Sequence, residues 1–92
     1  MELTQLREKI DEIDRELVAL FIKRMGVSAE VAEYKRRTKM AVLDADRERM
    51  LLDKVSALSG EQFEEYTRAL YATILELSRE YQQKALDAED KQ

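Results

Sequence analysis

Apolar residues recur at spacings of three and four from Leu3 to about Tyr34, with no turn dipeptide such as Asn-Gly to interrupt them. This period marks one face of an α-helix, so the sequence predicts a single helix of about 30 to 35 residues. Arg24 stands where the period calls for another aliphatic residue. An unpaired guanidinium is costly to bury, so we expect an anionic partner there, from the protein or from a ligand. The seam reads Leu3, Leu6, Ile10, Ile13, Leu17, Leu20, Arg24, Val27 and Val31.

A second, shorter helix is predicted after a loop at 38–43, where the apolar period is lost. Asp44 or Asp46 can cap its first turn, because a short carboxylate side chain accepts hydrogen bonds from free backbone N–H groups. Ser59-Gly60 is expected to end it. Its apolar face consists of Leu51, Leu52, Val55 and Leu58.

A third helix is predicted to begin near Ser59 and Gln62, which have the spacing of a capping box, and to reach the mid-eighties. Residues 87–92 carry no apolar period and are expected to fray. We therefore predict one helical domain over 1–86 and a polar tail over 87–92. The stripe of the third helix contains Phe63, Tyr66, Leu70, Ile74, Leu77 and Tyr81.

These elements predict an all-α fold of one long and two shorter helices. The chain has 92 residues, 45% of them hydrophobic and 39% charged, with 2 glycines and no proline, which is typical of one helical domain. The seam of the long helix keeps a seven-residue repeat that the two shorter helices cannot cover along its whole length. We therefore expect an intertwined, antiparallel homodimer.

Composition also restricts the chemistry. The chain contains no cysteine and no histidine, so we expect no metal and no cofactor. No stretch resembles a signal peptide or a membrane span, which predicts a soluble, cytoplasmic protein without a membrane partner. The net charge of -4 disfavours nucleic acid as a partner. A local basic run comprises Lys35, Arg36, Arg37 and Lys39. We interpret it as the C-terminus of a helix, where positive charges complement the helix dipole.

Polar side chains lie at the buried edge of all three predicted helices. Arg24 and Lys35 are eleven residues apart, about three full turns, so both point the same way. A set of cations, one interior carboxylate and neutral hydrogen-bonding groups without any histidine or cysteine suits electrostatic binding of a small polyanion. On the second and third helices the polar residues are Asp44, Arg47, Glu48, Ser78 and Gln82.

Each of these residues also has a structural explanation. Arg24 could pair with Glu48, Lys35 could extend its ammonium into solvent, and Ser78 and Gln82 could be exposed.

Arg7 adds an argument from geometry. It precedes Arg24 by seventeen residues, about 25 Å along one helix, so it cannot reach the same ligand from its own chain. In an antiparallel pair of long helices, Arg7 of one protomer can lie beside Arg24 of the other.

The segments LREKIDEIDRELVALFIKR, EVAEYK, DADRERMLL and LSREYQQ resemble the all-helical class of chorismate mutase, the type II domain, over roughly Leu3 to Gln83. The resemblance implies an isomerase that converts chorismate to prephenate in phenylalanine and tyrosine biosynthesis, without an enzyme nucleophile. The implied substrate-binding set is Arg7, Arg24, Lys35, Asp44, Arg47, Glu48, Ser78 and Gln82, of which Lys35, Gln82, Arg24 and Glu48 are the implied catalytic residues.

The resemblance also implies roles. Arg24 and the partner protomer's Arg7 would hold the two carboxylates of chorismate, helped by Arg47 and Ser78. Lys35 and Gln82 would donate hydrogen bonds to the ether oxygen of the substrate.

By the same resemblance Glu48, with the backbone near Asp44, would accept a hydrogen bond from the ring hydroxyl. Some relatives have a glutamate at the position of Gln82 that must be protonated, so the neutral amide here predicts activity that is not confined to acid.

Two alternatives remain at this point. An isochorismate-pyruvate lyase has the same fold and much of the same charge set. A non-catalytic helical dimerisation module would use Arg24 and Glu48 as a buried structural pair.

Overall fold

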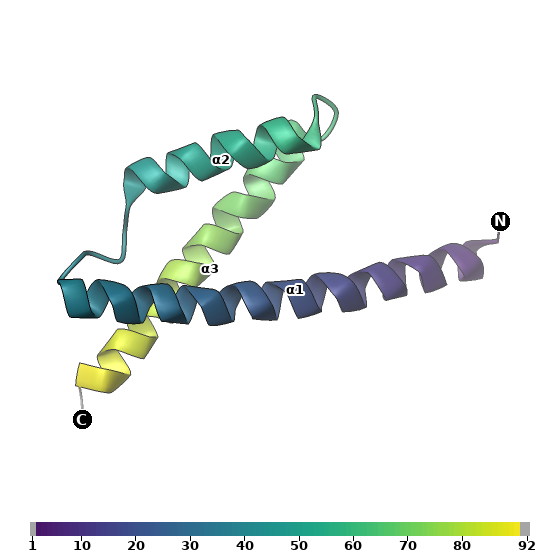
Figure 1. The fold of residues 1–92 in the computed structure, drawn as a ribbon. Helices are drawn as coiled ribbons and strands as arrows, with labels where there is room; N and C mark the ends of the chain where they lie inside the picture. Colours follow the sequence, from purple (N-terminus) through teal and green to yellow (C-terminus); the bar gives the residue numbers. More distant parts are fainter. Residues whose placement is uncertain (1, 91–92) are drawn as a thin grey trace.

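Residues 2–90, the part of the chain that this computed structural model describes, form three α-helices and no strand (Figure 1). α1 spans Leu3–Thr38, α2 spans Ala45–Ser59 and α3 spans Glu64–Asp90. α1 and α2 each pack against α3, and the N-terminal half of α1 projects beyond both. The prediction of an all-α fold with one long helix and two shorter ones is confirmed. Within 2–90, no helix is long and apolar enough to cross a lipid bilayer.

α1 runs for 36 residues and ends one turn later than the apolar pattern predicted. Its last turn contains Lys35, Arg36 and Arg37, whose positive charges are favourable beside the unpaired carbonyls of a helix C-terminus. Lys39 closes the helix in the left-handed conformation, with φ of 60°. The basic run is thus a helix C-terminus, as its position in the sequence suggested.

The ends of α2 agree with the prediction. Asp44 is the N-cap, and its Oδ1 accepts a hydrogen bond from the backbone N–H of Arg47 over 3.1 Å. Gly60 follows the last residue with φ of 80°, a conformation that favours glycine. The hydrogen bond at Asp44 fixes the end of the short loop between α1 and α2. The first turn of α2 therefore lies opposite the end of α1.

The predicted start of α3 is wrong. The Ser59 hydroxyl donates to the carbonyl of Ser56 over 2.9 Å instead of capping a new helix. A turn follows, in which the N–H of Phe63 donates to the carbonyl of Gly60 over 3.1 Å, and the helix begins at Glu64. α3 then continues to Asp90, so the predicted division between 86 and 87 falls inside a helix, and residues 91 and 92 lie outside the described part.

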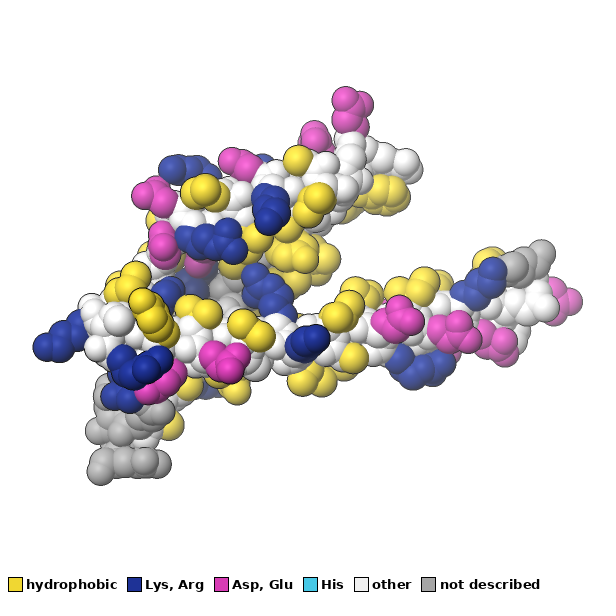
Figure 2. All heavy atoms as spheres, viewed as in Figure 1, with side chains coloured by type: hydrophobic (Ala, Val, Ile, Leu, Met, Phe, Trp, Pro, Cys, Tyr) yellow, Lys and Arg dark blue, Asp and Glu magenta, His cyan; other side chains and the backbone are white. Residues whose placement is uncertain are grey.

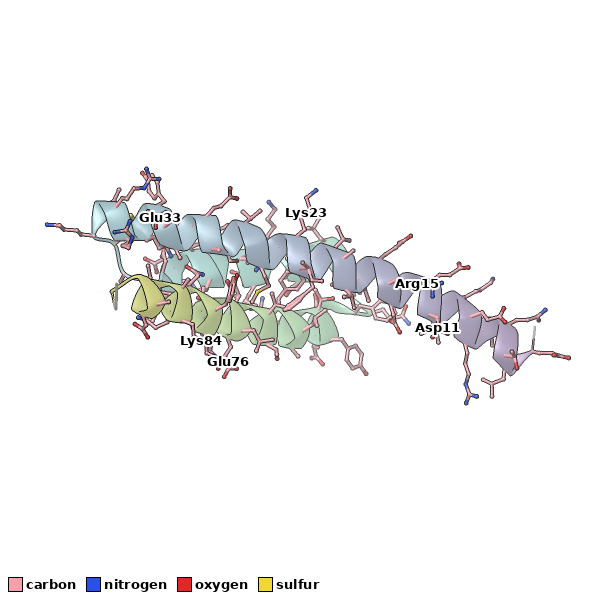
Figure 3. All side chains as sticks on the ribbon, turned by 90° about the horizontal axis from the view of Figure 1, so that it is seen from below. Asp11, Arg15, Lys23, Glu33, Glu76 and Lys84 are labelled. Atoms are coloured by element: carbon pink, nitrogen blue, oxygen red, sulfur yellow. The ribbon has the colours of Figure 1, made fainter. Side chains whose placement is uncertain are left out.

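The chain by itself buries little apolar surface. Among the described residues, the buried hydrophobic side chains are Ala32, Val55 and Leu75, one from each helix. The longest dimension of the chain, 55 Å, is about the length of α1 itself. The N-terminal part of α1, marked by Asp11 and Arg15 in Figure 3, stands clear of α2 and α3.

Candidate active site

A cavity of about 310 Å³ lies where α1 and α2 face each other across α3. All three helices and the loop between α1 and α2 contribute to its wall. Figure 2 shows basic side chains gathered in this region between α1 and α2. The structure brings together here every residue of the predicted set except Arg7, namely Arg24, Lys35, Asp44, Arg47, Glu48, Ser78 and Gln82.

Arg24 reaches this cavity from the middle of α1 and is half-buried. Its guanidinium carbon lies 5.9 Å from the centre of the Tyr71 ring, a distance at which a cation and an aromatic face attract each other. In the described part of the chain no carboxylate is within ion-pair distance of Arg24, because Glu48 is paired with Arg79 instead. The interpretation of Arg24 and Glu48 as a structural pair is therefore wrong.

Lys35 lies about three turns further along α1, on the same face. Its Nζ donates a hydrogen bond to the carbonyl oxygen of Val42 in the loop before α2, over 2.7 Å. The ammonium is thus held at the cavity wall instead of extending into solvent, and a lysine ammonium has two further N–H groups to donate.

Ser78 and Gln82 enter the cavity wall from α3 through a chain of hydrogen bonds. Gln82 Nε2 donates to Ser78 Oγ over 3.1 Å, and Ser78 Oγ donates to Ser28 Oγ on α1 over 2.9 Å. The exposed fractions of these residues are 7%, 5% and 8%, so the alternative in which Ser78 and Gln82 are surface residues is wrong.

Gln82 keeps hydrogen-bonding capacity in this arrangement. Its second Nε2 hydrogen is not used by Ser78, and its Oε1 is buried and accepts no hydrogen bond from any described residue. A buried amide oxygen without a donor costs about 1 to 3 kcal/mol, a cost that native proteins tolerate mainly at functional sites.

Glu48 lies in the first turn of α2, where its carboxylate accepts a hydrogen bond from Nη1 of Arg79 on α3. Arg79 and Ser28 also line the cavity, although neither belongs to the predicted set. A signal was available for Arg79, because it precedes the predicted Gln82 by three residues and such residues share a helix face.

The charges of the cavity wall are unequal. Four cations, Arg24, Lys35, Arg47 and Arg79, face two carboxylates, Asp44 and Glu48, which leaves an excess of two positive charges. The remaining lining is partly aliphatic, from Val27, Val31, Val42, Leu51 and Leu75. Such a wall favours a small dianion with an apolar body, held by charge-assisted hydrogen bonds.

Arg7 does not join this cavity. It lies on the projecting N-terminal part of α1, seventeen residues and about 25 Å along the helix from Arg24.

The fold and the cavity define a class: an all-helical domain with a small cavity whose lining is cationic and contains neither histidine nor cysteine. Residues 6–83 match the protein family described as chorismate mutase type II. The chain belongs to this family.

Curated relatives agree with the family. A chorismate mutase of Methanocaldococcus jannaschii is 33% identical over 60 residues, which cover 65% of this chain and 61% of that protein. The bifunctional chorismate mutase/prephenate dehydratase of Escherichia coli K12 is 36% identical over 76 residues, or 80% of this chain and 20% of that protein. This chain therefore spans about three fifths of the archaeal protein and about a fifth of the bifunctional one.

Proposed function

We propose that this chain is a chorismate mutase, an isomerase that rearranges chorismate to prephenate. The observation that carries the proposal is the cavity wall, which combines an excess of two positive charges with aliphatic patches and no histidine or cysteine. Chorismate is a dicarboxylate with an apolar ring and an enolpyruvyl ether. Its rearrangement breaks one carbon–oxygen bond and forms one carbon–carbon bond within the same molecule, so it requires no nucleophile and no cofactor.

In this proposal the guanidinium groups bind and orient the substrate. Arg24 holds one of its carboxylates and the partner's Arg7 holds the other, helped by Arg47 and Ser78. Arginine suits this role because its planar guanidinium group can donate two parallel hydrogen bonds to one carboxylate. The clamp restricts the flexible enolpyruvyl arm to the conformer in which the two reacting carbons are close, which lowers the entropic part of the barrier.

Lys35 and Gln82 act on the chemical step. Negative charge accumulates on the ether oxygen as its bond to the ring breaks, so donors aimed at this atom stabilise the transition state more than the substrate. Lys35 Nζ and Gln82 Nε2 both have unused N–H groups after their bonds to Val42 and Ser78, which supports this assignment.

Glu48 orients the substrate in the proposal. One oxygen of its carboxylate accepts from Arg79, and the other is available to accept from the ring hydroxyl of chorismate. The backbone at Asp44, fixed by the helix cap, contributes to the same end of the site.

The proposal includes a homodimer with two shared sites, in which each Arg7 belongs to the partner's cavity. The exposed seam of α1 supports it, because large apolar residues such as Ile10, Ile13 and Leu17 are more than half exposed in the protomer. A second copy running antiparallel would cover this seam and bring its Arg7 near Arg24.

We also propose that the reaction takes place in the cytoplasm on the way to phenylalanine and tyrosine. The bifunctional relatives support this role, because each is named for a second activity that uses prephenate.

The test is to follow the loss of chorismate's ultraviolet absorbance with purified protein, and to identify prephenate as the product. Arg24→Leu should abolish turnover, whereas Lys23→Leu, one residue earlier and pointing away from α3 (Figure 3), should leave it unchanged. Absence of turnover at high enzyme concentration, or release of pyruvate from isochorismate instead, would contradict the proposal.

A further inference from the structure

Arg79 forms an ion pair inside the cavity that links two helices. Its guanidinium, on α3, is bonded to the carboxylate of Glu48 in the first turn of α2. The exposed fractions of the two side chains are 34% and 20%, so both are largely removed from solvent. Both members of this ion pair belong to the cavity wall.

We infer that Arg79 is a positioning residue: it holds the Glu48 carboxylate in place and thereby sets the binding of the substrate's ring hydroxyl. The inference rests on the proposed function and deepens it by adding a residue outside the predicted set.

The geometry supplies the first reason. A glutamate side chain has three rotatable bonds, and only one of its carboxylate oxygens, Oε1, is bonded to Arg79. The bond fixes the orientation of the carboxylate and leaves Oε2 to accept from a hydroxyl. A functional group held by a second side chain in this way binds its ligand without first losing conformational freedom.

Charge supplies the second reason. An unpaired Glu48 would repel a dianionic substrate in the same cavity, where low exposure weakens screening by water. Arg79 compensates this charge and keeps the excess of two positive charges. Without Arg79 the carboxylate that recognises the hydroxyl would also weaken binding of the two substrate carboxylates.

A matched control exists elsewhere between α2 and α3. Arg68 is bonded to Asp53 over 2.7 Å and joins the same two helices, but the exposed fractions of these side chains are 46% and 66% and neither lines the cavity. If the Arg79 pair served only to hold α2 on α3, the loss of Arg68 would have the same kind of effect.

The experiment is a double-mutant cycle on the full chain, with kcat and KM for chorismate and the thermal midpoint as readouts. Arg79→Leu should raise KM about tenfold with kcat changed less than about threefold, because the hydroxyl contact is equal in substrate and transition state. Arg79→Lys should restore part of the loss. In a Glu48→Gln background, Arg79→Leu should have little further effect on KM. Arg68→Leu should leave KM unchanged.

The outcomes separate the possibilities. An equal rise in KM with and without Glu48 would show that Arg79 binds the substrate directly, and would overturn the inference. A lower thermal midpoint with unchanged KM would also overturn it, as would an equal effect of Arg68→Leu. If Arg79→Leu does not fold, Arg79→Gln provides the same comparison. Wild-type protein without turnover overturns the proposed function as well, whereas an active wild type with an unaffected Arg79 variant overturns the inference alone.

Discussion

Lys35 and Arg47 are both cations of the cavity wall, but they differ in what they contact. Lys35 is half-buried and fixed by its hydrogen bond to Val42, whereas the Arg47 side chain is exposed. We predict that Lys35→Ala lowers kcat on the order of 100-fold or more, because a donor aimed at the developing charge is lost. Arg47→Ala should raise KM and leave kcat closer to wild type. Steady-state kinetics on both variants tests this, and a Lys35→Ala enzyme with near-normal kcat would refute the role of Lys35.

Gln82 gives a prediction about pH. As an amide it donates at every pH, so the wild-type rate should not be confined to acid. In Gln82→Glu the new carboxylate can donate to the ether oxygen only when protonated, so activity should increase as the pH falls and be lost as it rises. Gln83→Glu, at the neighbouring amide that is exposed and bonded to Asp87 over 3.1 Å, is the control and should keep the wild-type profile. Two identical profiles would argue against a role of Gln82 in donation.

The sequence predicted which residues lie around one cavity, but it did not predict how they pair. The spacing of Arg24 and Lys35 placed both on one helix face, and both line the cavity. Which carboxylate meets which cation depends on how α2 and α3 are placed against each other, and periodicity within one helix carries no such information. For this reason the sequence suggested Arg24 as a candidate partner of Glu48, whereas in the structure Glu48 pairs with Arg79.

At the scale of the elements, Asp44 both caps α2 and lines the cavity. Asp44→Ala removes the acceptor for the Arg47 N–H and should lower the free energy of unfolding by about 1 kcal/mol, while Asp44→Asn should retain most of it. Asp46→Ala, at a side chain that is 82% exposed and paired with Arg49, is the control and should change stability by less than about 0.5 kcal/mol. Denaturant titrations at one protein concentration measure all three, and equal values for Asp44→Ala and Asp46→Ala would contradict the cap.

The helix boundaries predicted from the sequence are correct at both ends of α2, where a local cap determines them, and wrong at the start of α3. Asp44 and Gly60 act on their own neighbours, so the ends of α2 were predictable. The capping-box spacing after Ser59 is equally local, but the Ser59 hydroxyl has a competing acceptor in the last turn of α2, the Ser56 carbonyl, and bonds to it. The start of α3 was therefore placed several residues too early.

At the scale of the whole molecule, the chain has little core and a long exposed seam. Leu3, Leu17 and Leu20 are all more than half exposed, and no large side chain in the described part is fully buried. A soluble chain of this length is rarely stable with so much apolar surface in water, so a partner that covers the seam would contribute much of the stability. In the proposed dimer the same partner would also complete the cavity, because Arg7 lies too far along α1 to reach the cavity of its own chain.

Complementation between inactive variants tests the shared site. Arg7→Ala and Arg24→Ala homodimers should each be nearly inactive, since every site lacks one clamp. Unfolding and refolding them together in equal amounts gives about half mixed dimers, in which one site of two is intact, so about a quarter of the wild-type activity should return. Arg24→Ala with Lys35→Ala is the matched control and should recover nothing, because both residues come from the same protomer to the same cavity. Recovery in the control, or none in the Arg7 and Arg24 mixture, would contradict the proposed exchange of Arg7 between protomers.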